Sequence, residues 1–220
     1  MTFQSLGMKS FTAEAIHKTI LQLLKNETRG ALLDIGAGTG ALSKKLQEDG
    51  FNVTACDLSP HNFIPKQEIS CRQVDLNDVL PYEDETFDYV VGAEVIEHVE
   101  NPWHLMRELR RITKPNGIVV LSTPNLHNWY VRLFFLVTAR LYNFLSSYEK
   151  IGHITPVFVW SLERMARGRF RFMEVRTTHS LIPGLGISIP FKGLFWGQCI
   201  VVKMRREGGA AVNGQRAWYR

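Results

Sequence analysis

The stretch from Leu32 to Gly40, with the sequence LLDIGAGTG, constrains the fold of this chain more than any other segment. Its apolar first half predicts a buried strand, and the alternate glycines that follow predict a tight turn into a helix. Gly36, Gly38 and Gly40 allow the backbone to approach a ligand and to adopt dihedral angles that a Cβ would forbid. The start of the next helix then offers free N–H groups. The segment therefore predicts a nucleotide-cofactor site.

Strand and helix patterns alternate along most of the chain. The expected strands are 31–35, 52–57, 69–74, 87–92 and 117–122, and the expected helices are 13–25, 39–49, 102–113 and 156–167. This order predicts a parallel sheet with helices on both faces. Two last strands, 170–180 and 198–206, predict an antiparallel hairpin that closes it. We therefore expect an α/β fold with one doubly wound, mostly parallel seven-stranded sheet in a single domain, residues 1–206, and a flexible tail at 207–220.

Three aspartates follow or end the first three strands. Asp34 precedes the glycine turn, where a negative charge suits a cationic cofactor, and Asp57 is placed to hold both hydroxyls of a ribose. Asp75 is placed to accept a hydrogen bond from an adenine amino group. The G-x-G-x-x-A pattern alone also fits a dinucleotide site, so an NAD-dependent oxidoreductase is one alternative. A non-catalytic cofactor-binding subunit with this fold is another.

Together these residues resemble the class I S-adenosylmethionine-dependent methyltransferases, from about residue 31 to residue 125 and more loosely to residue 206. The resemblance implies a Rossmann-like methyltransferase fold and S-adenosylmethionine as the cofactor. It also implies a set of cofactor-binding residues, namely Asp34, Gly36, Gly38, Gly40, Asp57, Leu58, Asp75, Leu76 and Ala93.

A second signature follows the expected strand 87–92. Glu94, Glu97 and His98 are spaced i, i+3 and i+4, so one helical turn would place them on one face. Two carboxylates and an imidazole can bind a hard divalent cation, or can act as a base with an orienting acid. A surface turn with incidental acids is the alternative. We expect Glu97 and His98 to carry the catalytic chemistry, with His98 as the general base if no ion binds.

This segment, followed by Ser122-Thr123-Pro124-Asn125, resembles the branch of ubiquinone-biosynthesis O-methyltransferases and, more distantly, the small-RNA 2′-O-methyltransferases. The resemblance implies Mg²⁺ or a similar ion, held by Glu94, Glu97, His98 and His153. His153 could instead cap a loop or contact substrate. Residues 122–125 differ from the Asn/Asp-Pro-Pro-aromatic tetrad with which amino-methylating enzymes hold a planar nitrogen. This difference favours oxygen as the methyl acceptor.

Two apolar stretches, about 126–150 and 181–196, interrupt the alternating pattern. They carry too many charges or breakers to span a bilayer, and they suit a lid over a lipophilic acceptor, a contact with a membrane surface, a dimer interface or ordinary core. We expect a lipophilic small molecule as the methyl acceptor. An RNA 2′-O-methyltransferase is the alternative, although no RNA-binding appendage is recognisable, so a nucleic-acid partner is not expected.

The charge of the chain is unevenly distributed. Residues 1–110 carry 17 acidic and 10 basic side chains, and residues 111–220 carry 4 and 16. A basic half suits an anionic membrane, a nucleic acid or a phosphorylated substrate, and equally a solvated surface. The sequence has no signal-peptide pattern or long uncharged apolar run, and its three cysteines are widely spaced. We therefore expect core thiols and a cytoplasmic protein, peripheral at most to the inner face of the membrane.

Overall fold

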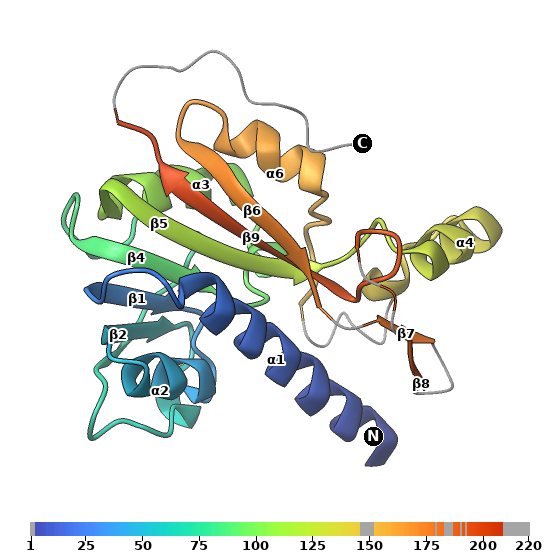
Figure 1. Cartoon of the computed structure of the whole chain (residues 1–220), viewed down its shortest axis with the longest axis horizontal. Coiled ribbons are helices and arrows are strands. Elements are labelled where there is room, and N and C mark those ends of the chain that lie inside the picture. The colour runs from blue at the N-terminus through green and yellow to red at the C-terminus, as the bar shows by residue number, and fades with distance from the viewer. Residues whose placement is uncertain are drawn as a thin grey trace.

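A computed structural model describes residues 3–145, 152–178, 180–182, 187–189, 191 and 193–208, with the backbone alone for 3–12, 181–182 and 187–189. Its centre is a seven-stranded sheet (Figure 1). The strands are, from one edge to the other, β3 (Cys71–Gln73), β2 (Asn52–Asp57), β1 (Ala31–Ile35), β4 (Phe87–Gly92), β5 (Thr113–Pro124), β9 (Cys199–Arg206) and β6 (Phe170–Thr177). The neighbouring pairs from β3 to β5 are parallel, and β9 is antiparallel to both β5 and β6. The predicted doubly wound sheet and its antiparallel closure are confirmed.

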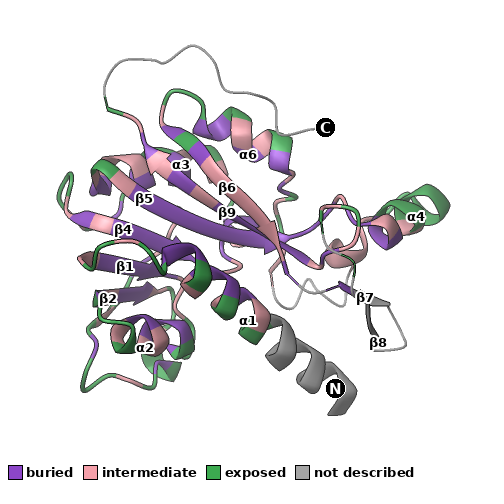
Figure 2. Cartoon of the chain, viewed as in Figure 1, coloured by how far each residue is buried: buried purple, intermediate pink, exposed green. Residues whose placement is uncertain are grey.

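Helices cover both faces of the sheet. On one face, α1 (Phe3–Leu24) and α2 (Ala41–Glu48) share a core cluster with Leu32 of β1. On the other face, α3 (Pro102–Ile112) and α6 (Val159–Ala166) share a cluster with Leu33. Successive β1 residues are thus buried on opposite faces, which is why the strand is apolar almost throughout. Figure 2 shows the same burial along the central strands.

Several predicted boundaries are wrong. Helix α1 starts at Phe3 instead of residue 13, because the prediction relied on the apolar period of Ile16, Ile20, Leu23 and Leu24, which lie in the later part of the helix. Strand β3 covers three residues of the predicted 69–74, since it is an edge strand that pairs only with Ala55–Asp57 of β2. Strand β5 runs from Thr113, through a stretch with Pro115 and Gly117 that resembles a turn in sequence.

The first apolar stretch forms α4 (Trp129–Thr138) and the short helix η3 (Tyr142–Phe144). In the second, β7 (Ser180–Ile182) and β8 (Ile187–Ile189) pair as a separate antiparallel ribbon. Residues 146–151, 183–186, 190 and 192 lie outside the described residues, as does most of the predicted tail, 209–220. Within the described part of the chain, no helix has the length and apolar character needed to cross a bilayer.

The cysteine prediction agrees with the structure. Cys56 and Cys199 are buried, Cys71 is half-buried, and all three are free thiols.

The carboxyl ends of β1, β2, β4 and β5 meet at one edge of the sheet, which is where ligands bind in this class of fold.

Candidate functional site

The glycine turn after β1 has a conformation that only glycine adopts without strain. Gly36 and Gly40 have φ values of +64° and +80°. A Cβ on Gly36 would lie 2.5 Å from Cγ2 of Val95, and one on Gly40 would lie 2.6 Å from the Phe63 ring. Gly38 also has a positive φ, +55°, yet no atom lies within 4 Å of the position its Cβ would take. The backbone at Gly38 therefore borders open space, as a ligand-binding turn requires.

Asp57 links the ends of β1 and β2. Its Oδ2 accepts a hydrogen bond from the Gly38 amide, at 2.8 Å, and its Oδ1 accepts one from the Ser59 amide, also at 2.8 Å. The carboxylate thus holds the glycine turn against the next loop while staying partly exposed. Asp75 makes a local turn instead, in which its Oδ1 accepts hydrogen bonds from the amide and the side chain of Asn77.

Asp34 is buried beneath the turn, only 1% exposed. The Ser43 hydroxyl of α2 donates a 2.5 Å hydrogen bond to its Oδ2. Burial raises the pKa of the Asp34 carboxyl to about 7; the Ser43 bond opposes this rise and the charge of Asp57 adds to it. A cationic ligand at the turn would favour the ionised form. The other residues predicted to bind the cofactor differ in exposure, since Leu58 is 61% exposed whereas Leu76 and Ala93 are half-buried.

The second signature forms a compact group beyond β4. Glu97 and His98 lie in the short helix η2 (Ile96–His98), and His153 comes from the segment before α6. The possible ligand atoms of Glu97, His98 and His153 all lie within 4.8 Å of one another. The two imidazole rings are 4.8 Å apart between centroids. Three of the four residues predicted to bind a metal are thus brought together.

Each imidazole of this group is oriented by a backbone carbonyl. Nδ1 of His98 lies 3.1 Å from the oxygen of Gly152, and Nδ1 of His153 lies 2.9 Å from the oxygen of Asn143. A carbonyl only accepts hydrogen bonds, so each Nδ1 carries a proton, and in the neutral form of each ring Nε2 is the nitrogen without one. This is the arrangement of imidazoles that bind metals or accept protons.

Glu97 is fully buried, and neither of its carboxylate oxygens meets the geometry of a hydrogen bond within the described part of the chain. Burial raises the pKa of Glu97 well above its ordinary value, and the nearby Glu94 carboxylate raises it further. The Thr123 side chain lies close enough to oppose the rise in the pKa of Glu97. Glu94 lies outside the three-residue group. Its backbone has a φ of +57°, its pKa is raised to about 7 by burial, and the Cys199 thiol contacts its carboxylate.

Two buried asparagines just beyond the end of β5 hold a loop in place, which the sequence analysis did not predict. Nδ2 of Asn125 donates 2.7 Å hydrogen bonds to the carbonyls of Leu194 and Gly197. Nδ2 of Asn128 donates equally short bonds to Trp196 and Gly197. Both asparagines are fully buried and hold the loop before β9 over the end of the sheet. In the sequence, Asn125 was noted only as part of the segment 122–125 that resembles known methyltransferases.

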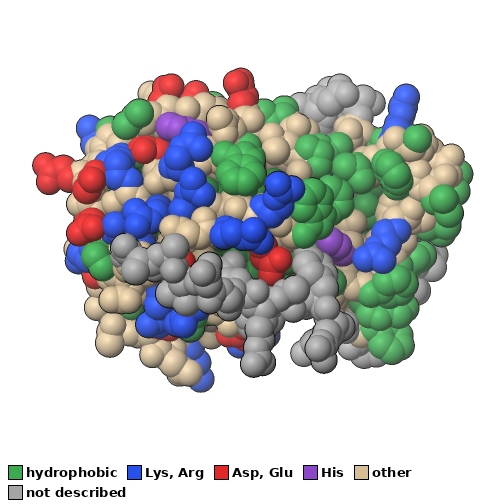
Figure 3. Space-filling view, turned by 90° about the horizontal axis from the view of Figure 1, so that it is seen from above, with side chains coloured by type: hydrophobic (Ala, Val, Ile, Leu, Met, Phe, Trp, Pro, Cys, Tyr) green, Lys and Arg blue, Asp and Glu red, His purple; other side chains and the backbone are tan. Residues whose placement is uncertain are grey.

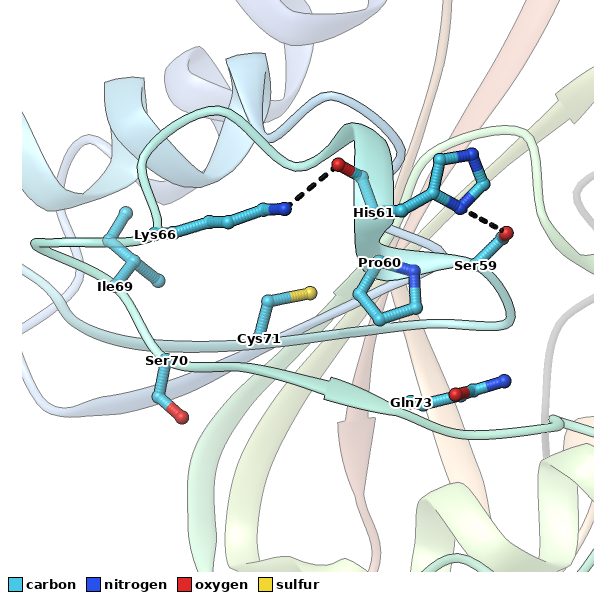
Figure 4. Close-up of a pocket in the computed structure, with 8 residues that line it drawn as sticks. All are labelled: Ser59, Pro60, His61, Lys66, Ile69, Ser70, Cys71 and Gln73. Carbon is cyan, nitrogen blue, oxygen red and sulfur yellow. Dashed lines mark hydrogen bonds between the residues drawn. The ribbon is translucent and has the colours of Figure 1, made fainter.

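A hollow of about 590 Å³ lies beside the Asp57 loop (Figure 4). It is lined by Ser59, Pro60, His61, Lys66, Ile69, Ser70, Cys71 and Gln73. None of these residues belongs to the predicted site, although Ser59 adjoins it through the bond to Asp57. The Lys66 ammonium and the His61 ring are already bonded within the loop, as the dashed lines show.

Known proteins share both the sequence pattern and the fold. Residues 8–179 match the family described as methyltransferase domain. Two relatives named ubiquinone biosynthesis O-methyltransferase, from Rickettsia typhi and Xanthomonas oryzae, are 35% and 33% identical over 100 and 102 residues. These alignments each cover 43% of this chain, and 41% and 43% of the relatives, so the chain spans less than half the length of the curated relatives it matches.

Solved structures agree in fold. A methyltransferase from Thermotoga maritima, described as a possible histamine N-methyltransferase, has a TM-score of 0.66 and 19% identity, and covers 90% of this chain and 91% of its own. An S-adenosylmethionine-dependent methyltransferase from Archaeoglobus fulgidus has a TM-score of 0.67 and 14% identity, covering 93% and 100%. These two structures show a shared fold, and the match over residues 8–179 shows that this chain belongs to the methyltransferase domain family.

Proposed function

We propose that the enzyme methylates a hydroxyl oxygen of a lipophilic small molecule. The group formed by Glu97, His98 and His153 carries this proposal, because it offers a proton acceptor beside the end of the sheet where the donor turn lies. The names of the two relatives support an oxygen acceptor with a lipophilic tail. Such acceptors partition into membranes, so we infer a cytoplasmic enzyme that works at the inner membrane surface.

On the donor side, the acidic residues and the glycine turn fit S-adenosylmethionine. When bound, it supplies a methyl group activated by a sulfonium charge. Asp34 contributes negative charge beneath the turn, and Gly38 leaves room for close approach of the backbone. Asp57 and Asp75 are the residues we assign to the ribose and the adenine, and Leu58, Leu76 and Ala93 to the apolar faces of the nucleoside.

On the acceptor side, His98 is the proton acceptor. The bond from its Nδ1 to the Gly152 carbonyl fixes the orientation of the ring, so that Nε2 is the basic nitrogen of its neutral form. As the acceptor oxygen attacks the methyl carbon in line with the breaking carbon–sulfur bond, its proton passes to Nε2. The products are the methyl ether and S-adenosylhomocysteine, and the imidazolium then loses its proton to solvent.

The same group fits a divalent cation. Glu97 is fully buried, neither of its oxygens has a hydrogen bond of normal geometry among the described residues, and a nearby positive charge would favour its ionised form. His98 and His153 would supply neutral nitrogens. Glu94, the fourth residue of the set predicted from sequence, lies outside this group, so the proposed cation site is formed by Glu97, His98 and His153. A bound Mg²⁺ or similar ion would lower the pKa of the acceptor hydroxyl.

The reaction can be tested with labelled S-adenosylmethionine and a prenylated catechol, using the fully methylated compound as the control. We expect labelled ether from the catechol only, and at least a hundredfold loss of rate in His98→Gln. Binding of Mn²⁺, followed by its paramagnetic signal, tests the cation independently of turnover, and Glu97→Gln is expected to abolish it. Donor binding without transfer to any hydroxyl would overturn the oxygen acceptor, and unchanged Mn²⁺ binding in Glu97→Gln would overturn the cation site.

A further inference from the structure

Helix α4 is apolar on the side that faces away from the protein. Its inner side chains Tyr130 and Val131 are buried against Leu126, which explains one apolar face. Packing does not explain the outer face. The exposed apolar side chains there are Leu133, Phe135, Leu136 and Val137, which are 53%, 51%, 81% and 76% exposed.

A second segment extends this face. Phe191 and Phe195 are 54% and 48% exposed, and both rings pack against Trp196. The Arg132 guanidinium of α4 lies 6.0 Å from the centroid of the Phe195 ring, and the Trp129 amide donates to the Phe195 carbonyl. The two segments therefore form one continuous surface. We call it the α4 surface: Leu133, Phe135, Leu136, Val137, Phe191 and Phe195, with Arg132 and Arg140.

The charges of the α4 surface have one sign. Between residues 126 and 145 the only charged side chains are Arg132 and Arg140, and both are exposed. Figure 3 shows basic side chains beside large apolar areas on the face seen from above. An apolar surface with arginines and without acids matches a partner that is apolar inside and anionic outside.

The position of α4 suits a flat partner. The helix extends beyond the end of β5, away from the body of the protein (Figure 1). Most of its length is exposed, which Figure 2 shows in green. Ten residues give a helix about 15 Å long, too short for a hydrocarbon core of about 30 Å, so α4 would lie in the plane of the interface.

We propose that the α4 surface docks on an anionic phospholipid bilayer. The apolar side chains enter the boundary between headgroups and acyl chains, and Arg132 and Arg140 reach the phosphates. Because α4 follows the end of β5, docking turns the carboxyl ends of the strands, and with them the candidate site, toward the lipid. A lipophilic acceptor could then pass from the bilayer to the site without crossing water.

Vesicle flotation without any methyl donor tests this proposal. We expect the wild type to float with vesicles of equal parts phosphatidylcholine and phosphatidylglycerol, and not with phosphatidylcholine alone. Val137→Glu should lower the partition coefficient roughly tenfold or more, because it removes apolar contact and adds repulsion. Val79→Glu is the matched control, since Val79 is 69% exposed and lies outside the α4 surface. Arg132→Gln and Arg140→Gln should each lower binding roughly fivefold without altering the apolar face.

Three results would overturn the proposal. The wild type could remain in solution with anionic vesicles, or Val79→Glu could weaken binding as much as Val137→Glu. The third such result would be a wild-type dimer in sedimentation that Val137→Glu dissociates, because a second copy of the chain would then cover the α4 surface instead of a bilayer. The assay contains no donor or acceptor, so its failure would leave the proposed methylation standing, and failure of the methylation would leave the docking standing.

Discussion

Asp34 is expected to make the binding of S-adenosylmethionine depend on pH. Its carboxyl has a pKa of about 7 in the free protein, raised from 3.8 chiefly by burial. This shift corresponds to about 4 kcal/mol in favour of the protonated form. Because the folded protein holds this proton more tightly than the unfolded chain does, Asp34 destabilises the fold progressively as the pH rises from about 4 to about 7.

A cationic donor reverses this preference. Below a pH of about 7, binding must release the proton from Asp34, so the Kd should rise by up to about tenfold for each unit of pH below that value. Above a pH of about 7 the carboxyl is already ionised and the Kd should be constant. Removing the Ser43 bond, which stabilises the carboxylate, should raise the pKa of Asp34 further and move the whole profile to higher pH.

Isothermal titration calorimetry across this range measures both the Kd and the protons released, if two buffers of different ionisation enthalpy are used. Asp34→Asn preserves the size of the side chain and should give a flat profile, whereas Ser43→Ala should give a displaced one. S-adenosylhomocysteine keeps the amino group of the donor and lacks the sulfonium charge, so a flatter profile with it identifies the sulfonium as the charge that Asp34 senses. A wild-type profile that is flat, or that survives in Asp34→Asn, would refute the reasoning.

Three further predictions concern stability and are measured by urea denaturation. Gly36→Ala should cost about 2–4 kcal/mol, since φ is +64° and the new Cβ would meet Val95 at 2.5 Å. Gly38→Ala should cost only about 1–2 kcal/mol while weakening donor binding, because its Cβ would occupy open space; equal stability losses in both variants would contradict the assigned geometry. Asn125→Ala should cost about 2–4 kcal/mol, because a buried amide loses two donated bonds and one accepted from His127, and a loss below about 1 kcal/mol would contradict this role.

Local patterns predicted most of the fold. The bounds of β1 and β4 match the expected strands, because each is a mostly buried run that ends at or just before a glycine. The start of α1 could not be predicted in this way, since the apolar period used for the prediction begins well inside the helix, at Ile16. Likewise, the exposed face of α4 resembles core in sequence, and only the packing of Tyr130 and Val131 reveals which side faces the protein.

The candidate site, like the fold, could be predicted only in part from the sequence. Spacing predicted that Glu94, Glu97 and His98 would lie on one face of a turn after the strand 87–92, whereas the prediction of His153 rested only on the resemblance to known methyltransferases. The structure brings Glu97, His98 and His153 together and leaves Glu94 outside the group.

Which ring nitrogen of His98 and His153 carries a proton could not be predicted. Their hydrogen-bond partners are the backbone carbonyls of Gly152 and Asn143, and since every residue has such a carbonyl, the sequence does not mark these two. The hydrogen bonds of the Asn125 and Asn128 amides could not be predicted for the same reason, because their partners are backbone carbonyls about seventy residues away. A sequence motif can name the side chains of a site, whereas backbone groups brought in by the fold decide which nitrogen carries a proton and which loop stays closed.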